Sequence, residues 1–124
     1  MSDPGGSAAP DPEPGLAISW SPAYHPAWDD SPQAYVDAGV VAAGRSRRLA
    51  KITDARHAFK AYLGVQHFDP ARWNLPGEPT AKFFASFFVH GRTLALRTYP
   101  TMGDALDAVR AFAAELAARD EVVQ

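Results

Sequence analysis

The sequence predicts an α+β fold in which a three-stranded antiparallel sheet packs on one long C-terminal helix, preceded by one or two short helices and an extended proline-rich N-terminal arm. Three observations lead to this fold class. Residues 82–99 form two alternating apolar and polar runs around His90 and Gly91, a pattern typical of a β-hairpin. Apolar residues recur at helical spacing within residues 106–116. Seven of the eleven prolines lie within residues 1–32, outside both patterns.

The first expected region is the arm, residues 1–30. Residues 1–15 are acidic and rich in Pro, Gly, Ser and Ala, so they bury too little apolar surface to offset the entropy of ordering. Within residues 16–30, aromatic side chains recur at four-residue intervals: Trp20, Tyr24 and Trp28. Because the two prolines between them rule out a regular helix, we expect an extended aromatic strap. The strap either packs on its own domain or docks in a groove of a partner.

The second expected region, residues 31–61, is a helical segment with a basic cluster. Ser31 followed by Pro32 is typical of a helix start and Gly44 of a helix end, which predicts a short helix near residues 32–43. The densest group of cations in the chain follows and is expected to open a second helix: Arg45, Arg47, Arg48 and Lys51. This cluster is the strongest phosphate-binding candidate, and the alternative is an ordinary solvated face.

The third expected region, residues 62–120, holds the sheet and the long helix. Residues 62–68 predict a strand, and residues 69–80 a long loop rich in Pro and Gly. Gly91 tolerates the positive φ of a two-residue hairpin turn. That turn would place six residues on one exposed face: Phe84, Ser86, Phe88, Thr93, Ala95 and Arg97. Thr101 is the expected N-cap of the long helix.

The charge of the chain is strongly segregated, although the net charge is only -2. Residues 1–44 carry six acidic side chains and no Lys or Arg, whereas residues 45–110 carry eleven basic and five acidic side chains. Such a basic middle could meet phosphate, an acidic protein surface or the chain's own acidic arm.

Composition limits the class of protein further. A chain of 124 residues forms one domain, and the absence of cysteine excludes disulfides, thiolate metal sites and a cysteine nucleophile. No apolar run approaches the about 20 residues that span a bilayer, and the N-terminus lacks the features of a secretory signal. We therefore expect a soluble intracellular protein without a transmembrane segment. An organellar location stays open, without a recognisable targeting peptide.

The titratable residues form no catalytic or metal-binding pattern. The four histidines are scattered, with no pair at helical ligand spacing beside a carboxylate: His25, His57, His67 and His90. Asp29 and Asp30 are adjacent on the proline-rich arm, where neighbouring side chains diverge. We find no phosphate-binding glycine loop, nucleophile elbow or dinucleotide fingerprint. The expectation is a non-catalytic protein with no cofactor and no metal.

The segments YLGV, KFFASFF and LRTYPTMGDALDAVRAF resemble the Apetala-type/ethylene-response-factor family of DNA-binding domains. The resemblance covers about residues 62–116 and implies a three-stranded sheet that reads DNA with its outer face. Most of the family's DNA-contact positions are replaced here, by Leu63, Gln66, Phe68, Ser86, Phe88, Thr93 and Ala95. The cations that remain on or near that face are Lys82, Arg92 and Arg97.

An exposed apolar patch centred on Phe84 and Phe88 indicates a protein ligand, unless the strap or the first helix covers the patch. We therefore expect a non-catalytic structural or adaptor subunit of a larger assembly, a ribonucleoprotein being one form, that uses the Apetala-type-like module to bind other protein subunits. The expected protein-interaction face is Leu63, Phe84, Ser86, Phe88, Ala95, Trp20, Tyr24 and Trp28.

The alternative is a sequence-specific DNA-binding or RNA-binding protein, such as a transcriptional regulator. Its nucleic-acid contacts would be Arg45, Arg47, Arg48, Lys51, Lys82, Arg92 and Arg97. The two phenylalanines Phe84 and Phe88 are also modest stacking platforms for single-stranded nucleic acid.

Overall fold

The computed structural model describes residues 16–54 and 59–123. Residues 1–15 of the expected arm and His57 lie outside the described residues. The elements follow in this order: β1 (Leu16–Trp20), η1 (Pro26–Trp28), α1 (Pro32–Asp37), β2 (Ser46–Asp54), β3 (Phe59–Phe68), η3 (Pro70–Trp73), β4 (Thr80–Val89), β5 (Arg92–Tyr99) and α2 (Met102–Val123).

The strands form one antiparallel sheet in the order β1-β2-β3-β4-β5, so each strand pairs with its neighbours along the chain. The expected three-stranded sheet was therefore wrong, because β1 and β2 add two strands. The basic cluster does not open a helix but lies in and just before β2. A bulge between Arg48 and Ala50 leaves Leu49 and Ala50 both buried, which interrupts the alternation expected of a strand.

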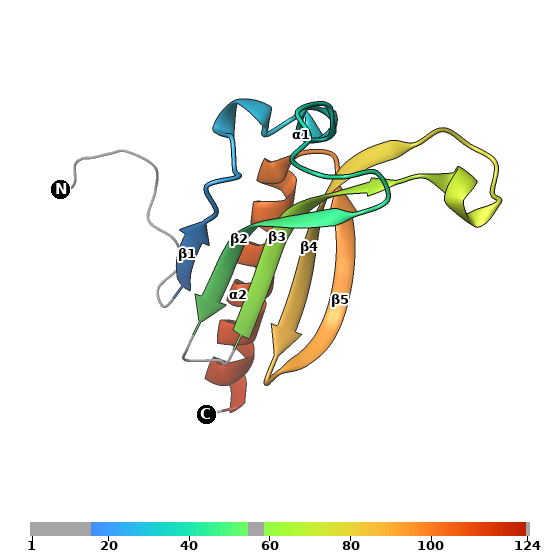
Figure 1. Ribbon diagram of the computed structural model, residues 1–124. Coiled ribbons are helices and arrows are strands. Elements are labelled where there is room, and N and C mark those ends of the chain that lie inside the picture. Colours follow the sequence, from blue (N-terminus) through green and yellow to red (C-terminus); the bar gives the residue numbers. More distant parts are fainter. Residues whose placement is uncertain (1–15, 55–58, 124) are drawn as a thin grey trace.

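The long helix α2 covers one face of this sheet and passes behind it in Figure 1. Its buried side chains meet the apolar side chains that β2, β3 and β4 direct toward it. The fully buried core includes Leu49, Ile52, Phe59, Leu63, Val65, Phe83, Met102 and Val109. The opposite face, which we call the outer face, has no helix over it among the described elements.

The short helix α1 extends this cover at one end of the sheet. The buried ring of Tyr35 meets Phe83 edge-on, with the ring centroids 6.0 Å apart. The helix ends at Asp37 rather than near residue 43, because Gly39 has a φ of 78° that leaves the helical region.

The start of α2 confirms the expected N-cap. The Thr101 Oγ1 accepts a hydrogen bond from the backbone N–H of Asp104 at 3.0 Å. The backbone N–H of Met102 donates to the carbonyl oxygen of Asp29 at 2.7 Å. The end of the aromatic strap thus supplies an acceptor to one of the first N–H groups of α2, which have no partner within the helix.

The β4–β5 hairpin turns as expected, with φ of 52° at His90 and 77° at Gly91. The faces of β5 nevertheless differ from the expectation. Phe88 pairs with Thr93 but Phe87 pairs with Ala95, so one extra residue bulges out of β5. Beyond the bulge, Leu96 and Thr98 share the outer face with Phe84 and Ser86, whereas Ala95 and Arg97 share the α2 side.

The Phe84 side chain is only 5% exposed although it lies on the outer face. It packs against Gly64 of β3, where a Cβ would lie 2.5 Å from the ring atoms Cε2 and Cζ and 2.3 Å from the Arg47 carbonyl oxygen. The missing side chain of Gly64 is what lets the ring lie down on the sheet.

We predict that Gly64→Ala lowers the free energy of unfolding by about 2 kcal/mol, because the added methyl must displace the Phe84 ring and the β2 backbone. Denaturant unfolding measures the change. Gly103→Ala is the matched control, since its Cβ would meet nothing closer than 3.9 Å at the start of α2. A Gly64→Ala protein as stable as the Gly103→Ala protein would contradict this packing.

Candidate functional site

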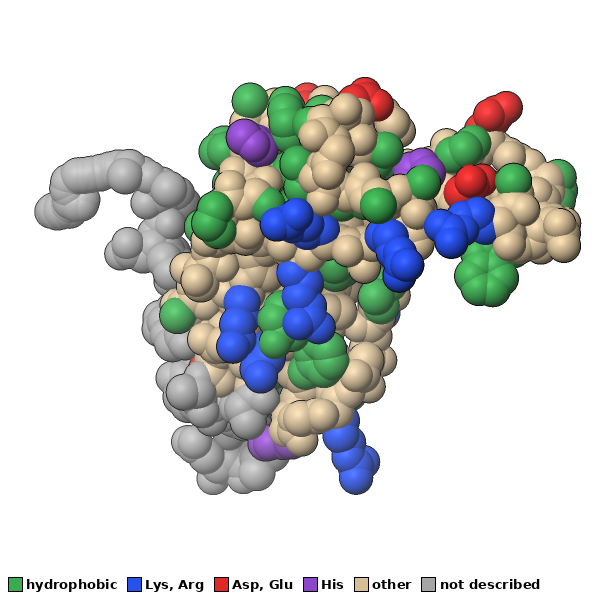
Figure 2. Space-filling view, in the orientation of Figure 1, with side chains coloured by type: hydrophobic (Ala, Val, Ile, Leu, Met, Phe, Trp, Pro, Cys, Tyr) green, Lys and Arg blue, Asp and Glu red, His purple; other side chains and the backbone are tan. Residues whose placement is uncertain are grey.

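The outer face of the sheet collects cations. Strand pairing directs four of them to this side: Arg48, Lys51, Lys60 and Lys82. Figure 2 shows Lys and Arg side chains gathered over the middle of the sheet, with hydrophobic side chains between them. Among the described strands, no outward-facing position carries an acidic side chain. The face is therefore electropositive despite the negative net charge of the chain.

A cation and two aromatic rings form the centre of this face. The guanidinium Cζ of Arg48 lies 3.7 Å from the centroid of the Tyr62 ring. Tyr62 in turn meets Phe88 edge-on, with centroids 5.7 Å apart and an interplanar angle of 83°. A cation over an aromatic face contributes about 0.5–1 kcal/mol at an exposed site. The stack holds the guanidinium in place while Arg48 as a whole stays exposed to solvent.

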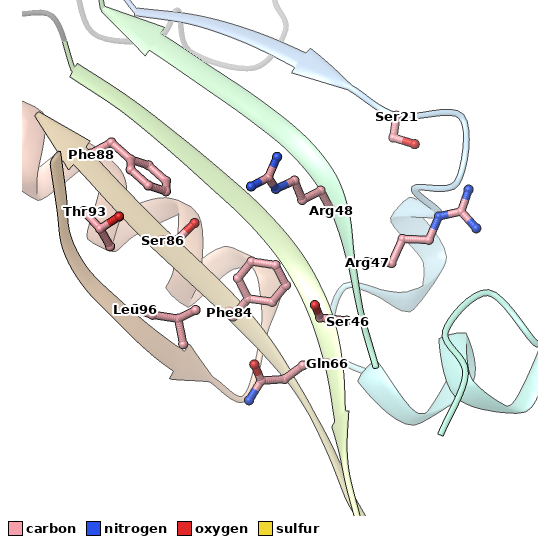
Figure 3. A pocket seen from close by; sticks show the side chains of 10 residues that line it. All are labelled: Ser21, Ser46, Arg47, Arg48, Gln66, Phe84, Ser86, Phe88, Thr93 and Leu96. Atoms are coloured by element: carbon pink, nitrogen blue, oxygen red, sulfur yellow. The ribbon is translucent and has the colours of Figure 1, made fainter. Parts of the chain in front are cut away.

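A hollow of about 670 Å³ opens beside this stack (Figure 3). Its lining is Ser21, Ser46, Arg47, Arg48, Gln66, Phe84, Ser86, Phe88, Thr93 and Leu96. Phe84 and Ser86 are nearly buried and form its floor. The hydroxyl and amide groups around that floor supply both donors and acceptors. The hollow can therefore hold a flat, partly polar group against an aromatic floor.

The residues expected to bind protein are not brought together on one surface. Phe88 lies half-buried on the outer face, and Phe84 and Ser86 lie buried below it. Leu63 is fully buried in the core, and Ala95 faces α2. Phe84 is therefore not the exposed centre of an apolar patch, although Leu96, which pairs with Ser86 on this face, is 58% exposed.

The aromatic strap packs on its own domain. The rings of Trp20 and Tyr24 stack with centroids 4.0 Å apart, and Trp28 meets Tyr35 edge-on at 4.9 Å. The Tyr24 hydroxyl donates to Asp29 Oδ1 at 2.7 Å. Burial, together with this carboxylate, raises the pKa of Tyr24 above its usual range. Of the two alternatives for the strap, packing on the chain itself is confirmed for the described residues.

The residues expected to contact nucleic acid divide between the two sides of the sheet. Lys51, Lys82 and Arg48 lie on the outer face, and Arg45 lies at its end beside Phe68. Three others do not join them. Arg47 pairs with Val65, whose side chain is buried on the α2 side, and its Nη1 donates to the Val40 carbonyl oxygen at 3.4 Å, although the residue also lines the hollow of Figure 3. Arg92 and Arg97 line grooves on the α2 side.

Two residues central to the site are missing from that expected set: Lys60 and Tyr62. Both belong to β3, which starts at Phe59 rather than at residue 62. An alternation traced from residue 59 would have placed Lys60, Tyr62, Gly64 and Gln66 on one face.

A metal-binding cluster and a membrane-spanning helix are both missing from the described part of the chain. Within residues 16–54 and 59–123, no three His, Cys, Asp or Glu side chains lie close enough to hold a metal ion. No described helix is both long and apolar enough to cross a bilayer.

Comparisons with protein-family models, with curated proteins and with solved structures gave no match to this chain. The resemblance to the Apetala-type family therefore stays a prediction.

The crowding of like charges on this face leads to a stability prediction. Lys51 pairs with Tyr62 and Lys60 with Thr53, which makes the two lysines diagonal neighbours across β2 and β3. We expect Lys51→Gln and Lys60→Gln together to leave stability unchanged or raise it by about 0.5 kcal/mol at low salt, with the gain shrinking as salt screens the charges. Thermal unfolding at two salt concentrations tests this. A clear loss of stability at low salt would show that the lysines have structural partners.

Proposed function

We propose that this protein binds nucleic acid with the outer face of its sheet. The observation that carries the proposal is the stack of Arg48 on Tyr62 beside Phe88, surrounded by cations with no acidic side chain on the same described face. This combination offers phosphate contacts and base contacts on one surface. It is the role in which all the features of the face are used.

The cations on the outer face would supply most of the affinity for nucleic acid. Neutralising phosphates with Lys and Arg releases condensed counterions, and this contribution accounts for most non-specific binding. No described acidic side chain pairs with Arg48, Lys51 or Lys60, so binding phosphate breaks no ion pair within residues 16–54 and 59–123. The Tyr62 ring also holds the Arg48 guanidinium in place, so the Arg48 side chain loses less conformational freedom when it binds a phosphate.

The aromatic and polar groups supply contacts to bases. Stacking on an aromatic ring is worth about 1–3 kcal/mol per base and works for every base. Phe88 is partly exposed and lines the hollow together with Gln66, Ser46 and Thr93, and Tyr62 meets Phe88 edge-on from the smaller hollow beside it. Hydrogen bonds from such side chains to base edges are the interactions that confer sequence preference.

We predict that Arg48→Gln, Lys51→Gln and Lys60→Gln together weaken nucleic-acid binding at least about tenfold, because fewer phosphates are neutralised and fewer counterions are released. The slope of log affinity against log salt should also become less steep by about 2. Fluorescence anisotropy with labelled oligonucleotides measures both.

The matched control removes the same charge from the α2 side: Arg92→Gln, Arg97→Gln and Arg119→Gln. If the two triple variants lose affinity equally, binding follows overall charge and the outer face is not the site. If the unsubstituted protein binds no nucleic acid at low salt, the proposed function fails.

The subunit role expected from the sequence is a second proposal, supported by a different surface. A groove of about 390 Å³ lies between β5 and α2, with Phe87 of β4 also contributing. Its lining is Phe87, Leu94, Ala95, Arg97, Tyr99, Ala108, Ala111, Phe112 and Glu115. The Leu94 side chain is 54% exposed at this place, beside the free edge of β5. Apolar grooves beside an unpaired strand favour protein contacts.

Native purification with and without nuclease separates the two roles. Under the nucleic-acid proposal, nucleic acid is recovered and proteins held through it are lost on digestion. A fixed set of proteins that survives nuclease, and that Leu94→Asp releases, supports the subunit role instead.

A further inference from the structure

The hollow beside the Arg48–Tyr62 stack continues in both directions along β3. On one side it shares Arg48 and Phe88 with a smaller hollow of about 320 Å³, which Lys60 and Tyr62 also line. On the other side it shares Ser46 and Gln66 with a hollow of about 430 Å³. These three hollows share lining residues and follow one another along β3 on the outer face, and we call this row of hollows the groove.

The far end of this groove is built on the connection between β3 and β4, residues 69–79, which we call the finger. It projects beyond the sheet in Figure 1 and carries the turn η3. The hollow at this end is lined by Arg45, Phe68 and Trp73. Cations and aromatic rings thus recur together at both ends of the groove.

Hydrogen bonds outside the core hold the backbone on either side of Trp73 in place. Arg72 Nη1 donates to the Ala43 carbonyl oxygen at 2.9 Å, and the Gly44 N–H donates to His67 Nδ1 at 3.1 Å. Asn74 adopts a left-handed φ of 58° that ends the turn. The Trp73 side chain is nevertheless 70% exposed. A large ring displayed on an anchored turn contributes little to folding and is suited to stacking on a ligand.

The five-stranded sheet as a whole is too wide to enter the major groove of a DNA duplex. Reading of paired bases by this sheet inside that groove is therefore excluded. Five strands about 4.8 Å apart place β1 about 19 Å from β5, whereas the major groove is about 12 Å wide and admits a two-stranded ribbon. The aromatic floor is also recessed, so paired bases inside a duplex could not reach it. Unpaired bases turned out from their backbone can.

We infer that the nucleic acid bound here is single-stranded and runs along β3 from the Arg48–Tyr62–Phe88 stack to the finger, where Trp73 stacks on a second base. The inference rests on the proposed function and adds the ligand class, the path and a second stacking residue. The cations of the groove follow the backbone of the strand, and the aromatic rings receive its bases.

The test compares a fluorescein-labelled mixed-sequence single strand of 12 nucleotides with the duplex of the same sequence, by anisotropy at one salt concentration. We expect the single strand to bind at least about tenfold more tightly. Trp73→Ala should weaken single-strand binding at least about fivefold, the loss expected for one stacked base, and Trp73→Phe should retain most of it. Leu75→Ala is the control, since Leu75 is 53% exposed on the same finger but lines none of the three hollows.

Two results would overturn the inference while leaving the proposed function intact. One is a duplex that binds as tightly as the single strand and loses affinity in the outer-face triple variant. The other is a Trp73→Ala protein that binds the single strand as tightly as the Leu75→Ala protein. Failure to bind either oligonucleotide at low salt would overturn the inference and the proposed function together.

Discussion

A single long helix can cover one face of a five-stranded sheet, and this constraint determines where the rest of the chemistry lies. The apolar residues of β2, β3 and β4 that face α2 form the core. The opposite side must remain compatible with water although it also carries aromatic residues. Two contacts solve that problem: Phe84 lies flat on Gly64, and Arg48 covers the ring of Tyr62.

These two contacts differ in how much of each side chain stays exposed and able to contact a ligand. The Phe84 ring is almost completely removed from solvent, so it forms a floor and little more. Arg48 and Tyr62 shield one another only in part, because a guanidinium over a ring keeps its N–H groups free. The same pair therefore contributes to stability in the free protein and offers a charge to a ligand, while Phe88 beside it offers a ring. For the neighbouring Lys51 and Lys60 no such contact is described, and their part in binding is a proposal.

The elements with simple periodicity could be predicted from the sequence. The hairpin at His90 and Gly91 and the helix starting after Thr101 are confirmed because their signals are local. The helix predicted in place of β2 was wrong, since the bulge puts Leu49 and Ala50 side by side in the core and leaves a spacing that also fits a helix. A second bulge reversed the expected faces of Ala95 and Arg97. A bulge depends on pairing between strands, and one-dimensional periodicity does not contain it.

The candidate site was harder to predict than the fold for the same reason. Arg48 and Lys51 could be identified as cations, but their neighbours Tyr62 and Lys60 come from another strand and depend on the register. The family resemblance placed Leu63 on the exposed face, and the hairpin alternation placed Phe84 there. Leu63 belongs to the core, and Phe84 is sheltered against a glycine on the next strand.

The finger is attached to the body through Arg72, and the end of β3 just before it through His67, whereas the exposed tip of the finger has no apolar packing on the body. Residues at that tip can therefore change with little effect on whether the chain folds. The sheet and the finger are therefore under separate structural constraints, because the sheet must keep its packing whereas the tip of the finger has few contacts to keep. Related chains could then differ in what they recognise by variation within residues 73–78 alone, without any rearrangement of the strands beneath.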